Sequence, residues 1–474
     1  MKVLLMTTNV RPQLKISEMP LITPPLNLMY VGEFLRQNGH EPKIVDAHGH
    51  NYLMDDVIRI AKKFEPGMIC ASVYSTDLRF CHSYLKQVRG ALPGVKIAVG
   101  GIHSTNLPEQ TLHEFEMIDF IIRGEGELTT KELADALEKN RPLSEVKGIS
   151  YRDEHGHVRH NADQPTIMDL DSIPIPGRDL IDTRIYYSKV AKRNPIDTLI
   201  TTRGCPFRCS FCPRLDNDFR KYRMRSPENV VEELKFIMEA GAKNIDFYDE
   251  TFTLDKERVK KIFELADKEG LDFDFRARTR VNAVDRELLE LFAQHNCDTI
   301  GYGIESGNQR VLDEIGKGIT LEQVKTAVAL TKKNNINVLG FFVVGLKGDT
   351  PESIQDTINF ACKLNTEFAT FNYAMPYPGS EDYLTAKANG TLQGDWGMDK
   401  PTPWIKLPWM NKHGDVIKWA DKAYRTFYFR PRYVSNWAYR TVRQRNWNQL
   451  AYAARNAWKG VRNVNFQVLA ESEE

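Results

Sequence analysis

Long apolar runs are missing from this chain. The segment before Thr7 has only four consecutive apolar residues, whereas a secretory signal needs roughly 7–15. The longest later apolar stretch, residues 337–346, falls well short of the ~18 residues that span a membrane. We therefore expect a cytoplasmic protein without a targeting or membrane-spanning segment.

The sequence also lacks an excess of charge of either sign. Its 64 Lys and Arg residues are balanced by 63 Asp and Glu residues, so the net charge predicts no polyanion partner such as nucleic acid. Apolar residues make up 42% of the 474 residues, which is typical of a globular protein with roughly three domains. The exception is the segment 412–462, where twelve Lys and Arg residues accompany only Asp415 and Asp421.

Cysteines are few, and four of the seven stand alone in the sequence. We expect these four to be small buried apolar residues. They are Cys70, Cys81, Cys297 and Cys362. The other three, Cys205, Cys209 and Cys212, lie within eight residues and can surround one soft metal centre. A structural zinc site needs a fourth ligand, and the candidate, His295, is distant in the sequence. A four-iron cluster with three cysteine ligands would instead leave one iron open for catalysis, while zinc or unrelated thiols remain the alternatives.

Strand and helix patterns alternate along residues 1–140. This alternation predicts an α/β fold with a parallel, doubly wound sheet. The expected strands are 3–6, 42–45, 68–73, 96–99 and 118–122, and the expected helices are 26–37, 53–63, 78–89 and 128–138. Ligands of such sheets bind at the carboxyl ends of the strands, where the chain carries Ser72, Gly100, Gly101 and Gly124. No G-x-G-x-x-G follows the first strand, so a dinucleotide is not the expected ligand.

A second alternation begins after a connector at residues 141–195, which contains a hairpin-like piece at 148–159. Six strand–helix repeats in residues 196–385 predict a full or partial βα barrel with its site at the C-terminal ends of the strands. The expected strands are 197–202, 244–248, 273–278, 299–304, 337–344 and 370–374. Capping residues before the helices are Ser226, Asp255, Asp285 and Thr350. We expect residues 386–474 to form a basic, aromatic and helical C-terminal region.

The spacing of the three clustered cysteines, C-x-x-x-C-x-x-C on the first loop of a βα barrel, resembles the radical S-adenosylmethionine (SAM) enzymes. A doubly wound domain before such a barrel is similar to their cobalamin-binding subclass. Three further segments are also similar to it: Asp169-Leu-Asp-Ser-Ile-Pro, Gly100-Gly101-Ile-His and Arg123-Gly-Glu-Gly-Glu. The sequence around Cys205 and the segment Tyr424-Arg-Thr-Phe-Tyr-Phe-Arg resemble the branch with anaerobic magnesium-protoporphyrin ester cyclase and hopanoid-modifying enzymes.

This resemblance implies three cofactors. Cys205, Cys209 and Cys212 would bind a [4Fe–4S] cluster, and SAM would chelate the fourth iron. One electron from a low-potential donor such as ferredoxin or flavodoxin would then cleave SAM into methionine and a 5′-deoxyadenosyl radical. Cobalamin would bind the domain at residues 1–140. Such a radical needs a dry, enclosed pocket, so that it meets only its intended hydrogen.

The resemblance also implies residues that bind SAM. Phe211 matches an aromatic position near the adenine. Glu250, in Asp249-Glu250-Thr251, matches the carboxylate that binds the SAM ammonium, which suits a charge-assisted acceptor. Glu305, in Gly303-Ile-Glu-Ser-Gly, would accept from the ribose hydroxyls. For each of them a purely structural role is the alternative.

Two arginines and two glycines complete the implied SAM site. Arg276 and Arg278 lie on the same side of the third barrel strand because successive strand residues alternate, and one of them would reach the SAM carboxylate. Gly345 and Gly348 loosely match a glycine-rich turn after the fifth strand. A structural role is again the alternative.

A histidine motif in the first domain is incomplete. Asp46-Ala-His48-Gly-His50-Asn51 resembles the D-x-H-x-x-G of cobalamin enzymes whose histidine ligates cobalt, but Asn51 replaces the glycine and the segment follows the second strand. We therefore expect a polar loop, and cobalamin bound without a histidine ligand.

The expected reaction is methylation of an unactivated carbon of a small, apolar molecule such as a lipid or a tetrapyrrole. Oxidative cyclisation without methyl transfer is the alternative that the ester-cyclase branch suggests. Modification of RNA is a further alternative, which only the basic tail favours, so nucleic acid is an unlikely partner.

The tail predicts two amphipathic helices. Apolar residues recur at helical spacing in both, and basic residues flank the second. The first stripe is Val416, Ala420, Ala423, Tyr424 and Phe427; the second is Trp447, Leu450, Ala451, Ala454, Trp458 and Val461, beside Arg455, Lys459 and Arg462. Both helices either pack on the barrel or touch anionic lipid at the inner membrane surface.

Overall fold

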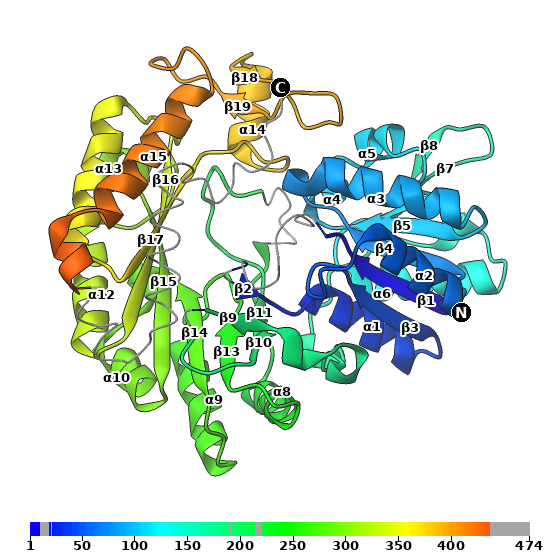
Figure 1. Cartoon of the computed structure of the whole chain (residues 1–474), viewed down its shortest axis with the longest axis horizontal. Helices are drawn as coiled ribbons and strands as arrows, with labels where there is room; N and C mark the ends of the chain where they lie inside the picture. Colours follow the sequence, from blue (N-terminus) through cyan, green and yellow to red (C-terminus); the bar gives the residue numbers. More distant parts are fainter. Residues whose placement is uncertain (10–18, 20, 190, 214–219, 437–474) are drawn as a thin grey trace.

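The computed structural model describes residues 1–9, 19, 21–189, 191–213 and 220–436. Two α/β units lie side by side, the first coloured blue to cyan and the second mostly green to yellow (Figure 1). Within these described ranges, no helix has the length and apolar character needed to cross a membrane.

The first unit is built on a seven-stranded sheet in the order β3-β1-β4-β5-β6-β7-β8. Its five parallel strands are β1 (Lys2–Thr7), β3 (Glu41–Asp46), β4 (Met68–Ser72), β5 (Lys96–Gly100) and β6 (Phe120–Ile122). Helices α1 (Leu26–Gln37) and α6 (Gly126–Glu138) pack on one face, and α2 (Met54–Phe64), α3 (Leu78–Ala91) and α5 (Pro108–Glu114) on the other. The expected doubly wound sheet is confirmed. Because the strand order reverses at β1, a crevice opens beyond the carboxyl ends of β1 and β4.

The hairpin of the expected connector belongs to this sheet. Strands β7 (Ile149–Arg152) and β8 (Val158–His160) add to its edge, and β7 pairs antiparallel with β6. The sheet therefore continues past residue 140, where we expected the first unit to end. A hairpin pattern shows only that two strands pair with each other, and not which sheet they join.

The second unit is a partial barrel of six parallel strands. Their order is β10 (Ile196–Leu199), β13 (Asn244–Phe247), β14 (Asp274–Thr279), β15 (Cys297–Glu305), β16 (Asn337–Val344) and β17 (Phe368–Tyr373). The sheet stays open in the described structure, because β10 and β17 form its two edges. Figure 1 shows it as a curved wall with helices on its outer side. The alternation in the sequence predicted all six strands.

Helices of the barrel begin where capping side chains were expected. Ser226, Asp255, Asp285 and Thr350 each accept a hydrogen bond from the backbone N–H three residues later. They precede α8 (Pro227–Glu239), α9 (Lys256–Lys268), α10 (Arg286–Gln294) and α13 (Pro351–Leu364). Such caps satisfy N–H groups that have no partner inside the helix.

The chain returns to the first unit after β17. Tyr383 of α14 (Glu381–Ala388) and Trp396 are buried in the hydrophobic core on the α3–α5 face of the first sheet. The Asn106 amide donates to the Pro378 carbonyl at 2.9 Å, which ties α4 (Ile102–Asn106) to this segment. The boundary that we expected at residue 385 therefore lies inside a helix that contacts both units.

The first tail helix packs on the barrel. In α15 (Gly414–Tyr428), Val416, Ala420, Ala423 and Phe427 are buried against the barrel core. This apolar stripe is therefore covered and unavailable to a lipid surface, which corrects the membrane interpretation for this helix. The second expected helix, at residues 447–461, lies outside the described residues.

Candidate functional site

A cavity of about 370 Å³ lies between the two units, at the carboxyl ends of β1, β4, β5 and β6. Four of its lining residues were expected at a ligand site: Ser72, Gly100, Gly101 and Gly124. The barrel contributes Gly204, directly before the first clustered cysteine, and Glu250. The structure thus brings residues of both expected sites to one cavity.

The glycine turn at β5 lets backbone border the cavity. Gly101 has φ of +103°, and a Cβ atom there would lie 2.8 Å from the Val73 carbonyl oxygen. A side chain at this position would therefore be strained and crowded. His103, in the first turn of α4, is buried, and its Nδ1 lies 2.9 Å from the Ser75 hydroxyl. Burial lowers the pKa of His103 to about 4, so this ring is neutral at neutral pH.

Besides Glu250, four charged residues line the cavity: Glu125, Glu127, Arg203 and Arg223. We call these four the inter-domain clamp. The glutamates come from the start of α6 in the first unit, and the arginines from β11 (Thr202–Arg203) and β12 (Arg223–Met224) beside the barrel. Burial would raise the pKa of Glu125, but Arg223 and Arg203 outweigh it and lower this pKa. Glu125 is therefore held as a carboxylate.

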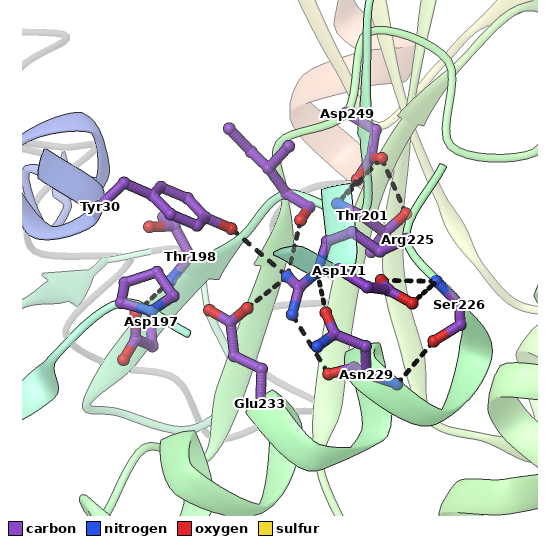
Figure 2. A network of polar contacts seen from close by, with 12 residues as sticks. Tyr30, Asp171, Asp197, Thr198, Thr201, Arg225, Ser226, Asn229, Glu233 and Asp249 are labelled. Atoms are coloured by element: carbon purple, nitrogen blue, oxygen red, sulfur yellow. Dashed lines mark hydrogen bonds and ion pairs between the residues drawn. The ribbon is translucent and has the colours of Figure 1, made fainter. Parts of the chain in front are cut away.

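A second ionic network, separate from the clamp, is centred on Arg225 (Figure 2). Its guanidinium donates to the Tyr30 hydroxyl at 3.3 Å, to the Ile200 carbonyl at 3.0 Å and to Glu233. The second carboxylate oxygen of Glu233 pairs with Arg178 at 2.6 Å. Tyr30 comes from α1, so Arg225 ties the first unit to the barrel.

The three clustered cysteines lie on the loop that follows β11. None of the three forms a disulfide within the described residues; Cys209 is buried, and Cys205 and Cys212 are half-buried. The Ser210 N–H donates to the Ile315 carbonyl at 3.0 Å, and its carbonyl accepts from the Asp382 N–H at 3.0 Å. The loop is thus fixed at its middle by backbone hydrogen bonds.

As a donor set, three cysteine side chains on one loop fit an iron–sulfur cluster. Among the described residues, however, no three His, Cys, Asp or Glu side chains are arranged as a ready metal site. The assignment of Cys205, Cys209 and Cys212 to a cluster therefore stays a prediction, supported by their spacing. Phe211 is partly buried and packs against the barrel core. This position agrees with the purely structural role that is the alternative for this residue.

A cation that we did not expect lies beside this loop. The Arg280 guanidinium stacks 3.7 Å from the centre of the Phe207 ring, and its Nη1 lies 4.0 Å from Cys209 Sγ. It also donates to the Lys317 carbonyl. In the sequence, Arg280 is one of several arginines after a strand, and nothing distinguishes it.

The two acidic residues after β13 have different positions. Asp249 is buried and accepts hydrogen bonds from the Thr201 N–H at 3.1 Å and from the hydroxyls of Thr201 and Thr202 at 2.8 and 2.5 Å. Burial raises the pKa of Asp249, against these hydrogen bonds. Asp249 thus holds the chain that leads to the cysteine loop. Glu250, the expected ligand of an ammonium group, is exposed and borders the cavity.

Both arginines that we expected to reach a carboxylate ligand contact Asp246 of β13 instead. Its Oδ2 lies 3.1 Å from Arg276 and 3.4 Å from Arg278. Arg278 also stacks 4.0 Å from the centre of the Tyr248 ring. Since Arg276 is 12% exposed and Arg278 is 34% exposed, Arg278 is the more accessible of the two. Neither lines the cavity.

Glu305 forms a buried ion pair, with Lys317 Nζ 2.7 Å from its carboxylate. Its φ is +67°, in the left-handed region that a glutamate rarely adopts. Such strain is typical of residues at functional sites, so Glu305 stays a candidate.

Gly345 is required for packing. Its φ is +78°, and a Cβ atom there would lie 2.5 Å from Val416 of α15. The structural interpretation accounts for this glycine, and any role in binding SAM stays a prediction. Gly348, with φ of +79°, lies in the same turn.

A buried carboxylate closes this turn and should make stability pH-dependent. Asp349 accepts from the N–H groups of Gly345 and Leu346 at 2.9 and 3.1 Å and from the Ser353 hydroxyl at 2.6 Å. Burial, opposed by these hydrogen bonds, raises the pKa of Asp349 to about 6. A raised pKa means that the folded state binds the proton more tightly. The stabilisation that this tighter proton binding gives the folded state is therefore complete below about pH 4 and lost above about pH 6.

The parent should lose this stabilisation as the pH rises from 4 to 7, whereas Asp349→Asn should not. The free energy of unfolding of the variant minus that of the parent should therefore rise by roughly 2–3 kcal/mol across this range, since one pKa unit corresponds to ~1.4 kcal/mol. Asparagine can accept from the same N–H groups and donate to Ser353. The difference in urea unfolding free energy between the two proteins, measured across this range, tests the expectation. A difference that does not change with pH would contradict it.

The incomplete histidine motif forms a polar loop after β3. The Asp46 carboxylate accepts from Thr7 and Tyr186 hydroxyls at 2.7 and 2.9 Å, and the His50 ring stacks on Tyr52 at 4.8 Å. Neither His48 nor His50 is among the described residues that line the cavity.

Comparisons with known proteins place both units. The family model described as the radical SAM superfamily matches residues 199–361, and the B12 binding domain model matches residues 14–134. The chain is 37% identical to an uncharacterised methyltransferase of Pyrococcus horikoshii, over 86% of this chain and 88% of the relative. It is 30% identical to the anaerobic magnesium-protoporphyrin IX monomethyl ester cyclase of Rubrivivax gelatinosus, over 85% of this chain and 74% of that protein.

A solved structure shares the fold. It is TsrM from Kitasatospora setae, a radical SAM methyltransferase with cobalamin and a [4Fe–4S] cluster bound. The TM-score is 0.70 over 91% of this chain and 86% of that one, at 18% identity. The two proteins therefore share the fold over most of both chains.

Proposed function

The chain belongs to the radical SAM enzymes that carry an N-terminal B12-binding domain, and we propose that it methylates an unactivated carbon of a small, apolar molecule. Its cofactors are a [4Fe–4S] cluster, SAM and cobalamin. When bound, they supply an adenosyl radical that removes hydrogen from carbon and a methyl group that replaces it. A reductant must deliver the electron, and we propose a low-potential donor of the ferredoxin or flavodoxin class.

The cavity between the units supports this proposal most directly. Apolar side chains, including Leu5, Leu28 and Ile122, form much of its wall, and the glycine turns allow backbone contact with a bulky, flat ligand. Gly204 places the cysteine loop at the same cavity. A ligand on the ends of β4 and β5 would therefore lie beside the cluster loop, as transfer between two cofactors requires.

The residues of this chain have separate tasks in the proposed site. Cys205, Cys209 and Cys212 would hold the cluster, and Glu250 would accept from the SAM ammonium at the edge of the cavity. The Arg278 guanidinium contacts the Asp246 carboxylate in this structure. Arg278 would have to leave this carboxylate to reach the SAM carboxylate. Glu305 stays with Lys317 unless a ribose hydroxyl replaces that partner.

Methyl transfer and cyclisation leave different products from SAM, so the proposal can be tested without knowing the substrate. The full chain, purified anaerobically and loaded with cluster and hydroxocobalamin, is incubated with SAM and titanium(III) citrate. A methyltransferase releases S-adenosylhomocysteine as well as 5′-deoxyadenosine. Release of 5′-deoxyadenosine and methionine alone would favour the alternative of the Rubrivivax gelatinosus relative, a cyclase of a tetrapyrrole ester.

We expect cobalamin to bind without a histidine on cobalt, because His48 and His50 are not among the described residues of the cavity wall. Electron paramagnetic resonance of the Co(II) form tests this. The spectra of the parent and of His48→Ala should be identical. Nitrogen superhyperfine coupling that is present in the parent and lost in His48→Ala would contradict the expectation.

A further inference from the structure

The inter-domain clamp lines the cavity and includes Arg203, which lies two residues before Cys205. Arg203 Nη1 lies 3.2 Å from Glu125 Oε1, and Arg203 Nη2 donates to Glu127. Arg223 donates to both carboxylate oxygens of Glu125 at 3.0 Å. Each carboxylate comes from the first unit and each guanidinium from the second. The clamp is therefore a set of charge-assisted hydrogen bonds across the domain interface.

The clamp is largely shielded from water. Glu127 is 4% exposed and Arg223 is 4% exposed, and the guanidinium of Arg203 lies 5.0 Å from the centre of the Tyr30 ring. Ion pairs in such surroundings are screened little by salt. Arg203 is therefore held by side chains of the first unit, namely Glu125, Glu127 and Tyr30.

The chain beside Arg203 has little regular structure of its own. Strand β11 has two residues, paired only with the two residues of β12, and Cys205 follows after one glycine. The position of Arg203 therefore sets where the cysteine loop begins. Asp249 holds Thr201 and Thr202, the two residues before Arg203. The clamp holds the Arg203 side chain itself.

All four clamp residues also line the cavity, so a ligand there contacts the same groups that position the loop. We propose that Glu125 and Glu127 are positioning residues that act through Arg203 and couple cobalamin binding to cluster assembly. This inference rests on the proposed function, which supplies the two cofactors. Coupling between two binding sites is reciprocal, so each cofactor strengthens the binding of the other by the same factor.

The coupling can be measured by binding, without turnover. Hydroxocobalamin is titrated anaerobically into the cluster-free and the cluster-loaded full chain, and the absorbance change gives the two dissociation constants. We expect the cluster-loaded chain to bind about 5-fold or more tightly, the lower end of typical coupling between sites. In Glu127→Gln and in Glu125→Gln this ratio should fall to about 1. Each variant removes a carboxylate that links the cavity to the position of Arg203.

Two further variants separate positioning from general damage. Glu33→Gln removes another buried glutamate of the first unit that pairs with an arginine, Arg36, but does not line the cavity, and it should keep the ratio. Arg203→Lys keeps the charge but loses the forked pair of donors, so its ratio should be intermediate.

The outcomes are distinct. Equal dissociation constants in the parent, with both cofactors bound, would overturn this inference and leave the proposed function standing, as would a ratio that Glu127→Gln and Glu125→Gln both leave unchanged. A parent chain that binds no cobalamin, or that takes up no iron and sulfide, would overturn the proposed function together with the inference.

Discussion

The variant with Cys205, Cys209 and Cys212 all replaced by alanine is expected to release no 5′-deoxyadenosine from SAM above the background of the reductant. The physical reason is the loss of every thiolate that the chain offers to the cluster on this loop. Even the loss of a group that only supports a metal ligand lowers affinity or activity roughly 10- to 100-fold. Removal of the ligands themselves should lower the rate by more than about 100-fold. The measurement is anaerobic turnover with dithionite, with iron and sulfide determined on the same samples.

The controls are cysteines away from the loop. Cys81 is buried in the core of the first unit and Cys362 lies on α13, so Cys81→Ala and Cys362→Ala should keep iron content and SAM cleavage. Cys70 is unsuitable as a control, because it lines the cavity. Cleavage of SAM by the triple variant at the rate of the parent would show that the cluster lies elsewhere and that the proposed mechanism is wrong.

Glu233→Ala is expected to lower the free energy of unfolding by about 3–5 kcal/mol. Glu233 is fully buried and is shared by Arg178 and Arg225. Figure 2 shows its contact with Arg225. Its removal leaves two buried guanidinium groups with one carboxylate, Asp197, at 3.3 Å from Arg178. An uncompensated buried charge costs far more than a lost surface ion pair. Urea unfolding of the cofactor-free chain, followed by circular dichroism, measures the loss.

An exposed ion pair provides the matched control. Glu264 contacts Lys261 and Lys268 at 3.1 and 2.8 Å on the surface of α9, where water screens the charges. Glu264→Ala should therefore leave the unfolding midpoint unchanged. Arg225 also donates to Asn229 Oδ1 at 2.6 Å. A midpoint for Glu233→Ala close to that of the control would mean that Asn229 and the Ile200 carbonyl suffice for Arg225, against this expectation.

The sequence by itself determined the elements and their order. Apolar residues at strand or helix spacing and four capping side chains are short-range features, so the six barrel strands and the parallel strands of the first sheet could be predicted from them. The cysteine loop was recognisable because its three residues lie within one short segment. The family followed from this loop and from the order of the two units.

The tertiary structure decided which charged groups meet. Arg276 and Arg278 share one face of β14 as alternation predicts, but only the neighbouring strand β13 shows that both contact Asp246. The pairing of Glu305 with Lys317 likewise depends on a turn that folds back over β15. Whether these residues bind SAM stays a prediction.

The clamp shows this division most clearly. The glutamates of Arg123-Gly-Glu-Gly-Glu were visible as a polar strand end, and Arg203 as the neighbour of a cysteine loop, yet 78 residues separate Glu125 from Arg203. Periodicity and capping act over one or two turns of chain, whereas ion pairs form between any residues that the packed domains bring together. The sequence therefore determined which strands and loops exist, and only the docking of the two units decided which of their side chains share a cavity.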